Sequence, residues 1–375
     1  MPLYLNDEQT MLRDTAKDLV AEHAPVSHMR GLRDANDVTG FSRDLWKQFA
    51  EMGFTGILIP EADSGLGLGH VEAGVVLEEI GRNLSPSPFL TTAVAAVAAL
   101  RDSPLRDRWF PGILSGDTVA ALAIDEGAKH RSSVGLKAER AGNGFKLSGA
   151  KQFVAHGHVA DLLIVAARTA GSAADRDGVT LFAVPNDAAG LTATPERLAD
   201  SSIAARLAFD GVAVDADAVI GEVDAGDGPL AALLAAGRTG ASAELLGVGV
   251  GAMDMTVGYL KERKQFGVAI GSFQALQHRA AHLYAEMEVA RAATLKAQQL
   301  LDAGDPGAAA AVSVAKAQTS LATTLSVEEG VQMHGGIGMT DEFDIGFYMK
   351  RARVLAEMFG DANFHADLLA RETGY

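Results

Sequence analysis

The sequence predicts an α+β fold in which a helical N-terminal domain, a central antiparallel β domain and a C-terminal helical bundle follow one another. Apolar residues recur at helical spacing up to about Leu114, and short apolar runs between turn-forming residues follow Gly116. Helical spacing returns at Gly228 and continues to the end. We therefore place the domains at residues 1–117, 118–226 and 227–375.

The first predicted domain begins with a helix that has its own start signal. Asn6 is followed three residues later by Gln9, the pattern of an N-cap residue and its reciprocal partner. The segment 59–69, IPEADSGLGLG, is too rich in turn formers to be helical. We predict a structured loop there, inside an otherwise helical domain.

The second predicted domain consists of short strands. Gly142-Asn143-Gly144 is its clearest hairpin signal, because glycine and asparagine tolerate the positive φ angles of tight turns. The runs that we predict as strands begin at Phe145, Gln152, Asp161, Val179 and Arg206.

The third predicted domain is an antiparallel helix bundle. One helical stripe is formed by residues spaced alternately four and three apart: Leu276, Ala280, Leu283, Met287 and Ala290. The alanine-rich segment 308–322 predicts a second long helix, and the stretch from Asp302 to Gly307 predicts the turn between the two.

Composition excludes several classes of function. The chain has 375 residues, 48% of them hydrophobic, a formal net charge of −16 and no cysteine. The negative charge disfavours nucleic acid and anionic membranes, and the lack of cysteine excludes disulfides, thiolate zinc sites and a cysteine nucleophile. Residues 1–13 lack the pattern of a secretory signal, and the apolar stretch 89–100 is too short to span a bilayer. We expect a cytoplasmic protein without a membrane segment.

Three segments carry a resemblance to a known family. They are residues 59–82, 259–281 (YLKERKQFGVAIGSFQALQHRAA) and 331–353 (VQMHGGIGMTDEFDIGFYMKRAR). Each is similar in residue type and spacing to a block of the acyl-CoA dehydrogenases, and the similarity extends over essentially the whole chain. The resemblance implies the acyl-CoA dehydrogenase fold with a C-terminal four-helix bundle. It also implies an FAD flavoprotein oxidoreductase of lipid metabolism, in fatty acid or steroid degradation.

The same resemblance implies the residues that hold FAD across a contact between two subunits. Arg263 matches the arginine that pairs with the pyrophosphate of the neighbouring subunit's FAD, a role suited to a guanidinium. Read alone, Arg263 would be a solvated charge at a helix end. The other positions implied to contact the cofactor are Phe266, Gln274, Gln332, Gly335, Gly336, Phe153 and Ala155. No metal site is expected, and His334 is interpreted as a packed or hydrogen-bonded histidine.

The chain departs from the family at the catalytic base. Most relatives carry a glutamate before a glycine near the C-terminus, where this chain has Phe359 before Gly360. A minority carry it before an arginine on an earlier helix, where this chain has Gly237. Glu244 and Asp361 are the remaining candidates, and for each the alternative is a solvated or helix-stabilising carboxylate.

The segments implied to face the flavin depart as well. Many relatives have a Thr-Glu-Pro loop where this chain reads AIDEGAKH at 123–130, and a Trp-Ile-Thr segment where it reads Phe153-Val154-Ala155. Phe153 is expected to shield one flavin face, and the backbone N–H of Ala155 to reach the flavin ring.

The residues implied to contact a neighbouring subunit's FAD are kept, whereas the base and the segments implied to face this chain's own flavin are altered. With the resemblance, this contrast implies the base-free subunit of a heteromeric, steroid side-chain type acyl-CoA dehydrogenase. The expected partners are an acyl-CoA substrate, an electron-transfer flavoprotein and a glutamate-bearing paralogous subunit in a homo- or hetero-tetramer. Two alternatives stay open: a non-catalytic scaffold that completes a partner's FAD site, and a homo-oligomeric flavoenzyme with a different base.

Overall fold

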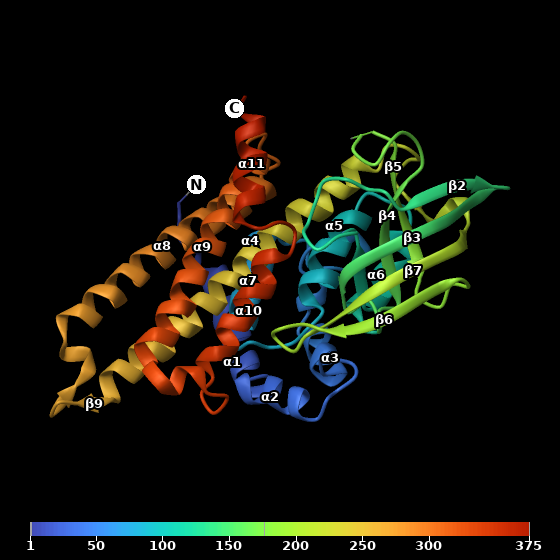
Figure 1. The fold of residues 1–375 in the computed structure, drawn as a ribbon. Helices are drawn as coiled ribbons and strands as arrows, with labels where there is room; N and C mark the ends of the chain where they lie inside the picture. The colour runs from blue at the N-terminus through green and yellow to red at the C-terminus, as the bar shows by residue number, and fades with distance from the viewer. Residues whose placement is uncertain (1, 176, 375) are drawn as a thin grey trace. The chain divides into compact units, whose positions relative to one another are not determined.

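The computed structural model describes residues 2–175 and 177–374 as two compact units (Figure 1). The first unit is formed by residues 1–31, 70–85 and 238–375. The second is formed by residues 32–69 and 86–237. Both draw on segments that lie far apart in the sequence, so neither is a simple third of the chain.

The first unit is helical. Its long helices are α7 (Asp227–Glu262), which enters the unit at Arg238, α8 (Gln274–Asp302) and α9 (Ala308–His334). The shorter elements are α1 (Asp7–His23), the start of α2 (Val26–Asp34), α4 (His70–Arg82), α10 (Ile345–Glu357) and α11 (Ala362–Glu372), with the strand pair β9 (Lys264–Gln265) and β10 (Val268–Ala269) and the 3₁₀ turns η5 (Ile270–Ser272) and η6 (Gly335–Met339).

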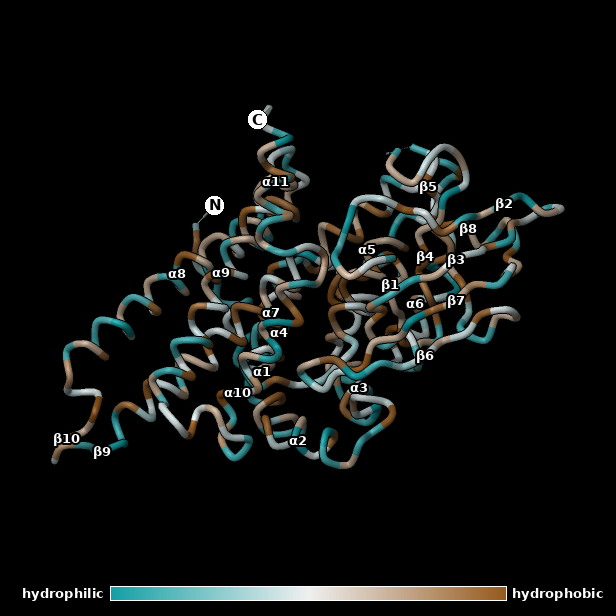
Figure 2. Tube along the Cα trace, in the orientation of Figure 1, coloured by the Kyte–Doolittle hydropathy of each residue, from teal (hydrophilic) through white to brown (hydrophobic). Residues whose placement is uncertain are grey.

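The predicted details of the helical segments are confirmed. The side chain of Asn6 accepts from the Gln9 N–H at 2.8 Å, and the Gln9 side chain accepts from the Asn6 N–H at 3.0 Å. In α8 the stripe residues Leu283, Met287 and Ala290 are buried, and the chain turns between Asp302 and Ala308 as expected. The tube of α8 accordingly alternates between hydrophilic and hydrophobic residues (Figure 2).

Helix α4 contacts α7 main chain against main chain. A Cβ atom at Gly81 would overlap the carbonyl oxygen of Glu244, and one at Gly247 would overlap the carbonyl oxygen of Glu78. A Cβ at Gly251 would lie 2.6 Å from the carbonyl oxygen of Arg82. Only glycine permits so close an approach, and it joins an early segment of the chain to the bundle.

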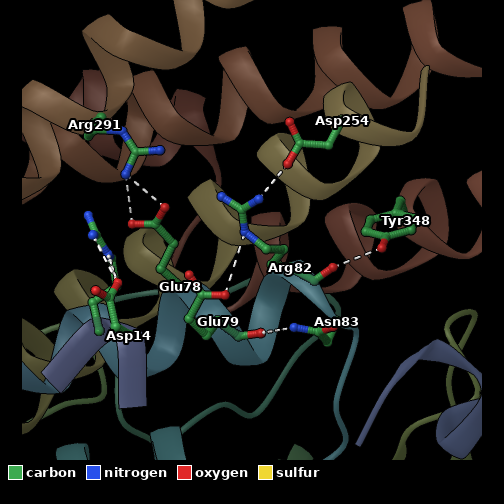
Figure 3. Close-up of polar contacts among 9 residues, drawn as sticks. Asp14, Glu78, Glu79, Arg82, Asn83, Asp254, Arg291 and Tyr348 are labelled. Carbon is green, nitrogen blue, oxygen red and sulfur yellow. Dashed lines mark hydrogen bonds and ion pairs between the residues drawn. The ribbon is translucent and has the colours of Figure 1, made fainter. Parts of the chain in front are cut away.

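Ion pairs and one hydroxyl flank this crossing (Figure 3). Arg291 of α8 donates to Glu78 at 2.7 Å, and Arg82 pairs with both Glu79 and Asp254. Burial raises the pKa of Glu79, and the charge of Arg82 opposes that rise. The hydroxyl of Tyr348 on α10 donates to the carbonyl oxygen of Arg82 at 2.8 Å, which satisfies a carbonyl at the end of α4.

The second unit combines short helices with one mixed sheet. Its helices are α3 (Arg43–Glu51), α5 (Val97–Leu100), α6 (Arg106–Leu114), the π-helix η3 (Leu90–Ala96) and the 3₁₀ turns η1 (Phe54–Gly56), η2 (Glu61–Asp63) and η4 (Ala216–Ala218). The predicted loop at 59–69 is largely irregular and contains η2. The strands are β1 (Ala120–Ala123), β2 (Lys137–Ala141), β3 (Gly144–Ala155), β4 (Leu162–Arg168), β5 (Val179–Pro185), β6 (Leu191–Arg197), β7 (Ile203–Val214) and β8 (Val219–Ile220).

The sheet has the order β6-β7-β3-β2-β4-β5-β8, with β1 paired to β4. Most pairs are antiparallel, as predicted, and the two-residue turn between β2 and β3 at Gly142-Asn143 is confirmed. Both β1 and β2 run parallel to β4. The long connection from β1 to β4 is the crossover that parallel pairing of these two strands requires. The residues of β4 are buried along the whole strand.

The two runs predicted as separate strands, at Phe145 and Gln152, form the single strand β3. Its pairing with β7 shifts register between Leu147 and Gly149 and again between Lys151 and Val154. A long strand with two irregularities therefore looks like two short strands in the sequence.

Two absences concern the described part of the chain, residues 2–175 and 177–374. No helix there combines the length and the apolar character needed to cross a bilayer. No group of three or more His, Asp or Glu side chains there is placed to hold a metal ion.

Candidate functional site

One end of the helical unit carries the Arg263 segment. Helix α7 ends at Glu262, and the chain then turns through the β9–β10 hairpin, whose two strands are labelled in Figure 2. Phe266 and Gly267 form its tip with φ angles of 53° and 81°, as in a two-residue hairpin turn. Phe266 is 92% exposed, and Arg263 is exposed too. Among the described residues, the Arg263 side chain has no hydrogen-bond or ion-pair partner.

Gln274 lies beside this hairpin. It is the first residue of α8 and is exposed. The ring of the preceding residue, Phe273, contacts the ring of Phe266 edge to face with centroids 6.2 Å apart. The structure therefore brings Arg263, Phe266 and Gln274 to one exposed surface.

The second half of the candidate site is the turn at the end of α9. Gln332, Gly335 and Gly336 are all exposed. Gly335 has a φ of 66°, and its N–H donates to the Gln332 carbonyl oxygen. A Cβ atom at Gly335 or Gly336 would meet no atom within 4 Å, so the main chain here is open to an approaching molecule.

Ring contacts place the two halves at the same end of the unit. Tyr259, one turn before Arg263, stacks on His334, one residue before Gly335, with centroids 4.5 Å apart and an interplanar angle of 29°. Phe343 contacts both rings, at 4.7 Å from His334 and 5.9 Å from Tyr259. We call Tyr259, His334 and Phe343 the ring triad. His334 is buried and hydrogen-bonded to the Gly330 carbonyl oxygen, which confirms its interpretation as a packed, hydrogen-bonded histidine.

The residues present fit a dinucleotide. An exposed guanidinium that has no carboxylate partner among the described residues suits a pyrophosphate, which it can pair bidentately. Exposed glycines at a helix end let the remainder of a flat ligand lie against the main chain. All of these groups are exposed on the surface of the single chain.

The position expected for the base is also in the helical unit. Phe359 is buried and has a φ of 59°, a left-handed conformation that bulky residues rarely adopt. The Arg238 guanidinium donates to the Phe359 carbonyl oxygen at 3.2 Å. Lys316 Nζ donates to the carbonyl oxygens of Gly360 and Ala356, each at 3.0 Å. Two basic side chains thus hold the turn that contains the buried ring of Phe359.

Lys316 is fully buried in α9. Burial, and after it the charge of Arg238, lowers the pKa of Lys316 to about 7, although Asp361 and Glu357 oppose the shift. A neutral amine still donates hydrogen bonds, so the turn keeps its anchor when the proton is lost.

We predict that Lys316→Met flattens the pH dependence of stability. The unfolded lysine binds a proton up to its ordinary pKa of 10.5, whereas the folded lysine releases it at about 7. Unfolding therefore takes up a proton between these values, so Lys316 makes the free energy of unfolding rise with pH, by at most ~1.4 kcal/mol per pH unit. Urea unfolding at several pH values measures the slope. Lys350→Met, on the exposed face of α10, is the matched control, and equal slopes in wild type and Lys316→Met would refute the prediction.

The two remaining base candidates have structural partners. Glu244 is buried and forms an ion pair and hydrogen bonds with Arg351 of α10. Asp361 is the N-cap of α11, and its carboxylate accepts from the Phe364 N–H at 2.9 Å. Gly237, the other position expected for the base, is buried within α7. These partners favour the helix-stabilising interpretation of both carboxylates.

In the second unit, Phe153 and Ala155 lie at the end of β3. Phe153 has a φ of 53° and is half exposed, at the register shift in the strand. Two residues earlier, the buried Lys151 Nζ donates to Glu126 at 2.7 Å. Glu126 also accepts from the Leu136 N–H at 2.8 Å, so this ion pair fixes the loop that follows β1.

Sequence reasoning missed several residues that shape these sites, among them Lys316, Arg351 and Tyr259. Of these residues, Lys316 was the one that the sequence could have indicated, because it is a single charged residue within a stretch of α9 that is otherwise small and apolar. A charge on a buried helix face needs a polar partner, and that requirement was the available signal.

Models of one protein family match nearly the whole chain. The N-terminal, middle and C-terminal domains of acyl-CoA dehydrogenase match residues 6–117, 125–212 and 229–374. This chain therefore belongs to the acyl-CoA dehydrogenase family, whose members are FAD-dependent oxidoreductases. The predicted fold class and cofactor are confirmed.

Individual relatives agree with this assignment. The acyl-CoA dehydrogenase IpdE2 of Mycolicibacterium smegmatis is 33% identical over 360 residues, covering 95% of this chain and 96% of the relative. Among solved structures, a variant of the Tcur3481-Tcur3483 steroid ACAD has 30% identity and a TM-score of 0.88, covering 97% of both chains. The ChsE4-ChsE5 complex from Mycobacterium tuberculosis has 26% identity and a TM-score of 0.90, covering 100% of this chain and 99% of that one.

Proposed function

We propose that this chain is the base-free subunit of a heteromeric acyl-CoA dehydrogenase. The complex would oxidise an acyl-CoA thioester to its α,β-unsaturated form and pass the electrons to an electron-transfer flavoprotein. The observation that carries the proposal is the turn at Phe359, which is firmly anchored yet holds a buried phenyl ring where relatives place a glutamate.

The two halves of the candidate cofactor site support a role toward a neighbouring subunit. FAD, when bound, would accept the hydride that leaves the substrate β-carbon. Arg263 would pair with its pyrophosphate, and the Gly335-Gly336 turn would lie against its adenosine half. Phe266 and Gln274 would complete the contact from the hairpin side. All these groups are exposed in the single chain, as a contribution to another subunit's cofactor requires.

The base must then come from elsewhere. Removal of the α-proton of a thioester needs a general base. Phe359 and Gly237 have no carboxylate, and the carboxylates of Glu244 and Asp361 are engaged with other groups of this chain. A glutamate-bearing paralogous subunit is the simplest source. Two of the solved structures of similar fold carry the names of two proteins, Tcur3481-Tcur3483 and ChsE4-ChsE5, and the former is described as a steroid ACAD. We therefore propose a steroid side-chain thioester as the substrate class.

Flavin counting and dye reduction test the proposal. The chain is purified alone and together with a glutamate-bearing paralogue, and FAD per subunit and acyl-CoA-dependent dye reduction are measured for both. We expect turnover from the pair and none above background from the lone chain. Full flavin occupancy with turnover from the lone chain would instead identify a homo-oligomeric flavoenzyme with a different base.

A scaffold role is the second candidate, favoured by the departures at Phe153 and Ala155 in the segment that would face this chain's own flavin. It predicts one FAD for each pair of chains, bound only in the partner's cleft. Two FAD molecules for each pair would exclude it.

A further inference from the structure

The two halves of the proposed cofactor site lie on the ends of different helices and need a common support. Arg263 directly follows α7, whereas Gly335 directly follows α9. Helix ends fray, so two ends that grip one ligand hold their spacing only if something joins them. The ring triad joins these two helix ends.

His334 contacts both helix ends at once. Its ring stacks on Tyr259, and the carbonyl oxygen of Tyr259 accepts the N–H of Arg263 at 2.8 Å. The Arg263 carbonyl oxygen in turn accepts the Ile270 N–H at 2.8 Å, which closes the base of the β9–β10 hairpin. On the other side, His334 is covalently joined to Gly335. The imidazole therefore contacts the residue whose carbonyl oxygen holds the Arg263 N–H, and it belongs to the residue that directly precedes the glycine turn.

The imidazole itself is held in a single orientation. The ring nitrogen Nδ1 lies 2.7 Å from the Gly330 carbonyl oxygen, which only accepts, so Nδ1 carries the proton and donates. Burial lowers the pKa of His334, which keeps the ring neutral. Nε2 is buried and has no hydrogen-bond partner among the described residues, so the outer edge of the ring serves packing alone.

Close packing next to the ring triad also holds the ends of α7 and α9 together. A Cβ atom at Gly330 would lie 3.0 Å from Oγ1 of Thr256 on α7, and one at Gly338 would lie 3.0 Å from the Cβ of His334. The main chain at Gly330 therefore lies close to α7, and the main chain at Gly338 lies close to the Cβ of His334.

We propose that His334 is a positioning residue that sets the spacing between Arg263 and the Gly335-Gly336 turn through its stack on Tyr259. This inference rests on the proposed function, because it assumes that both halves grip the same FAD. It adds a requirement that exposed ligand-contacting residues alone would not impose: the flavin affinity depends on a buried ring that lies outside the contact surface.

Three substitutions separate the possible contributions of His334. His334→Ala removes both the ring and the donor, His334→Phe keeps a ring, and His334→Asn keeps a donor near the position of Nδ1. We expect His334→Ala and His334→Asn to weaken FAD affinity about tenfold, from the loss of two ring contacts, and His334→Phe to stay within about threefold of wild type. Rescue by asparagine and not by phenylalanine would overturn the proposal.

Leu283→Ala is the control for general loosening. Leu283 is buried with Leu260 and Met333 at the same end of the bundle and is no member of the triad. Its truncation lowers stability without removing a ring contact, so FAD affinity should change less than about twofold once the protein is folded. A loss equal to that of His334→Ala would show ordinary core packing and refute positioning.

Hydrogen exchange gives a readout that needs no flavin. In the full chain, the Arg263 amide should exchange at least about tenfold faster in His334→Ala than in Leu283→Ala, because only the former releases the Tyr259 turn. Equal exchange rates in the two variants would contradict the inference.

Arg263→Ala and His334→Ala, each alone and then combined, distinguish failure of the inference from failure of the proposed function. If Arg263→Ala leaves FAD affinity unchanged, the proposed function fails. If Arg263→Ala weakens FAD binding but His334→Ala does not, the function stands and the inference is wrong. If His334 acts through Arg263, adding His334→Ala to Arg263→Ala should cost less than about threefold more.

Discussion

Replacing Arg263 with alanine should weaken FAD retention by roughly 10- to 150-fold, the range expected for losing a hydrogen-bonded charge pair of about 1.5–3 kcal/mol. The fold should be little affected, because Arg263 is exposed and its side chain has no partner within the described residues. Flavin content after gel filtration and the midpoint of urea unfolding measure the two quantities separately.

Two further substitutions sharpen this test. Arg263→Lys keeps the charge but loses the planar fork, so its FAD affinity should fall between those of wild type and Arg263→Ala. Arg353→Ala removes another exposed guanidinium, paired with Glu357 at 3.0 Å on α10, and should leave FAD binding unchanged. Unaltered flavin content in Arg263→Ala would mean that Arg263 does not hold the pyrophosphate.

Phe359→Glu should raise acyl-CoA-dependent flavin reduction by this chain about 10²- to 10⁴-fold over Phe359→Gln, the range that a positioned general base supplies. The turn is already held by Arg238 and Lys316, so the new side chain inherits an anchored backbone. Burial at this position would raise the pKa of the new carboxyl, and the charge of Arg238 at the same turn would oppose that rise.

The comparison with glutamine isolates the carboxylate. Phe359→Gln has almost the same shape as Phe359→Glu and removes the same aromatic ring, but it accepts no proton. Single-turnover reduction with an acyl-CoA thioester is monitored through the loss of flavin absorbance, and this gives the rate constants for both variants. Equal rates would show that the acyl-CoA site of this chain lacks more than a base.

The fold was readable from the sequence where local signals agree with tertiary structure. The Asn6 cap, the Gly142-Asn143 turn and the α8 stripe all act within a few residues, and all are confirmed. Strand β1 was missed, because its four small or apolar residues carry no alternation and pair only with the distant β4. The division of β3 into two runs was wrong because its register shifts resemble turns in the sequence.

The candidate site was predictable only where the family resemblance marked it. Arg263, Gln332 and Gly336 stand in recognisable segments, and the structure brings their two helix ends to one end of the bundle. The support beneath them was not predictable, because the Tyr259 to His334 stack joins residues that are far apart in the sequence. The anchoring of Phe359 by Lys316 and Arg238 depends in the same way on contacts that no local pattern encodes.

The glycine crossing of α4 and α7 has a consequence for dissecting the protein. Since Gly81, Gly247 and Gly251 bring two main chains together, no rotation of side chains can fill the space that α4 occupies. A fragment starting at residue 227 would contain every helix from α7 onward and yet expose main-chain peptide groups along α7. It would also lack Glu78, which pairs with Arg291, and Arg82, which pairs with Asp254. The C-terminal helices are thus not expected to fold independently. A fragment that contains only these helices should aggregate or associate with another helix in place of α4.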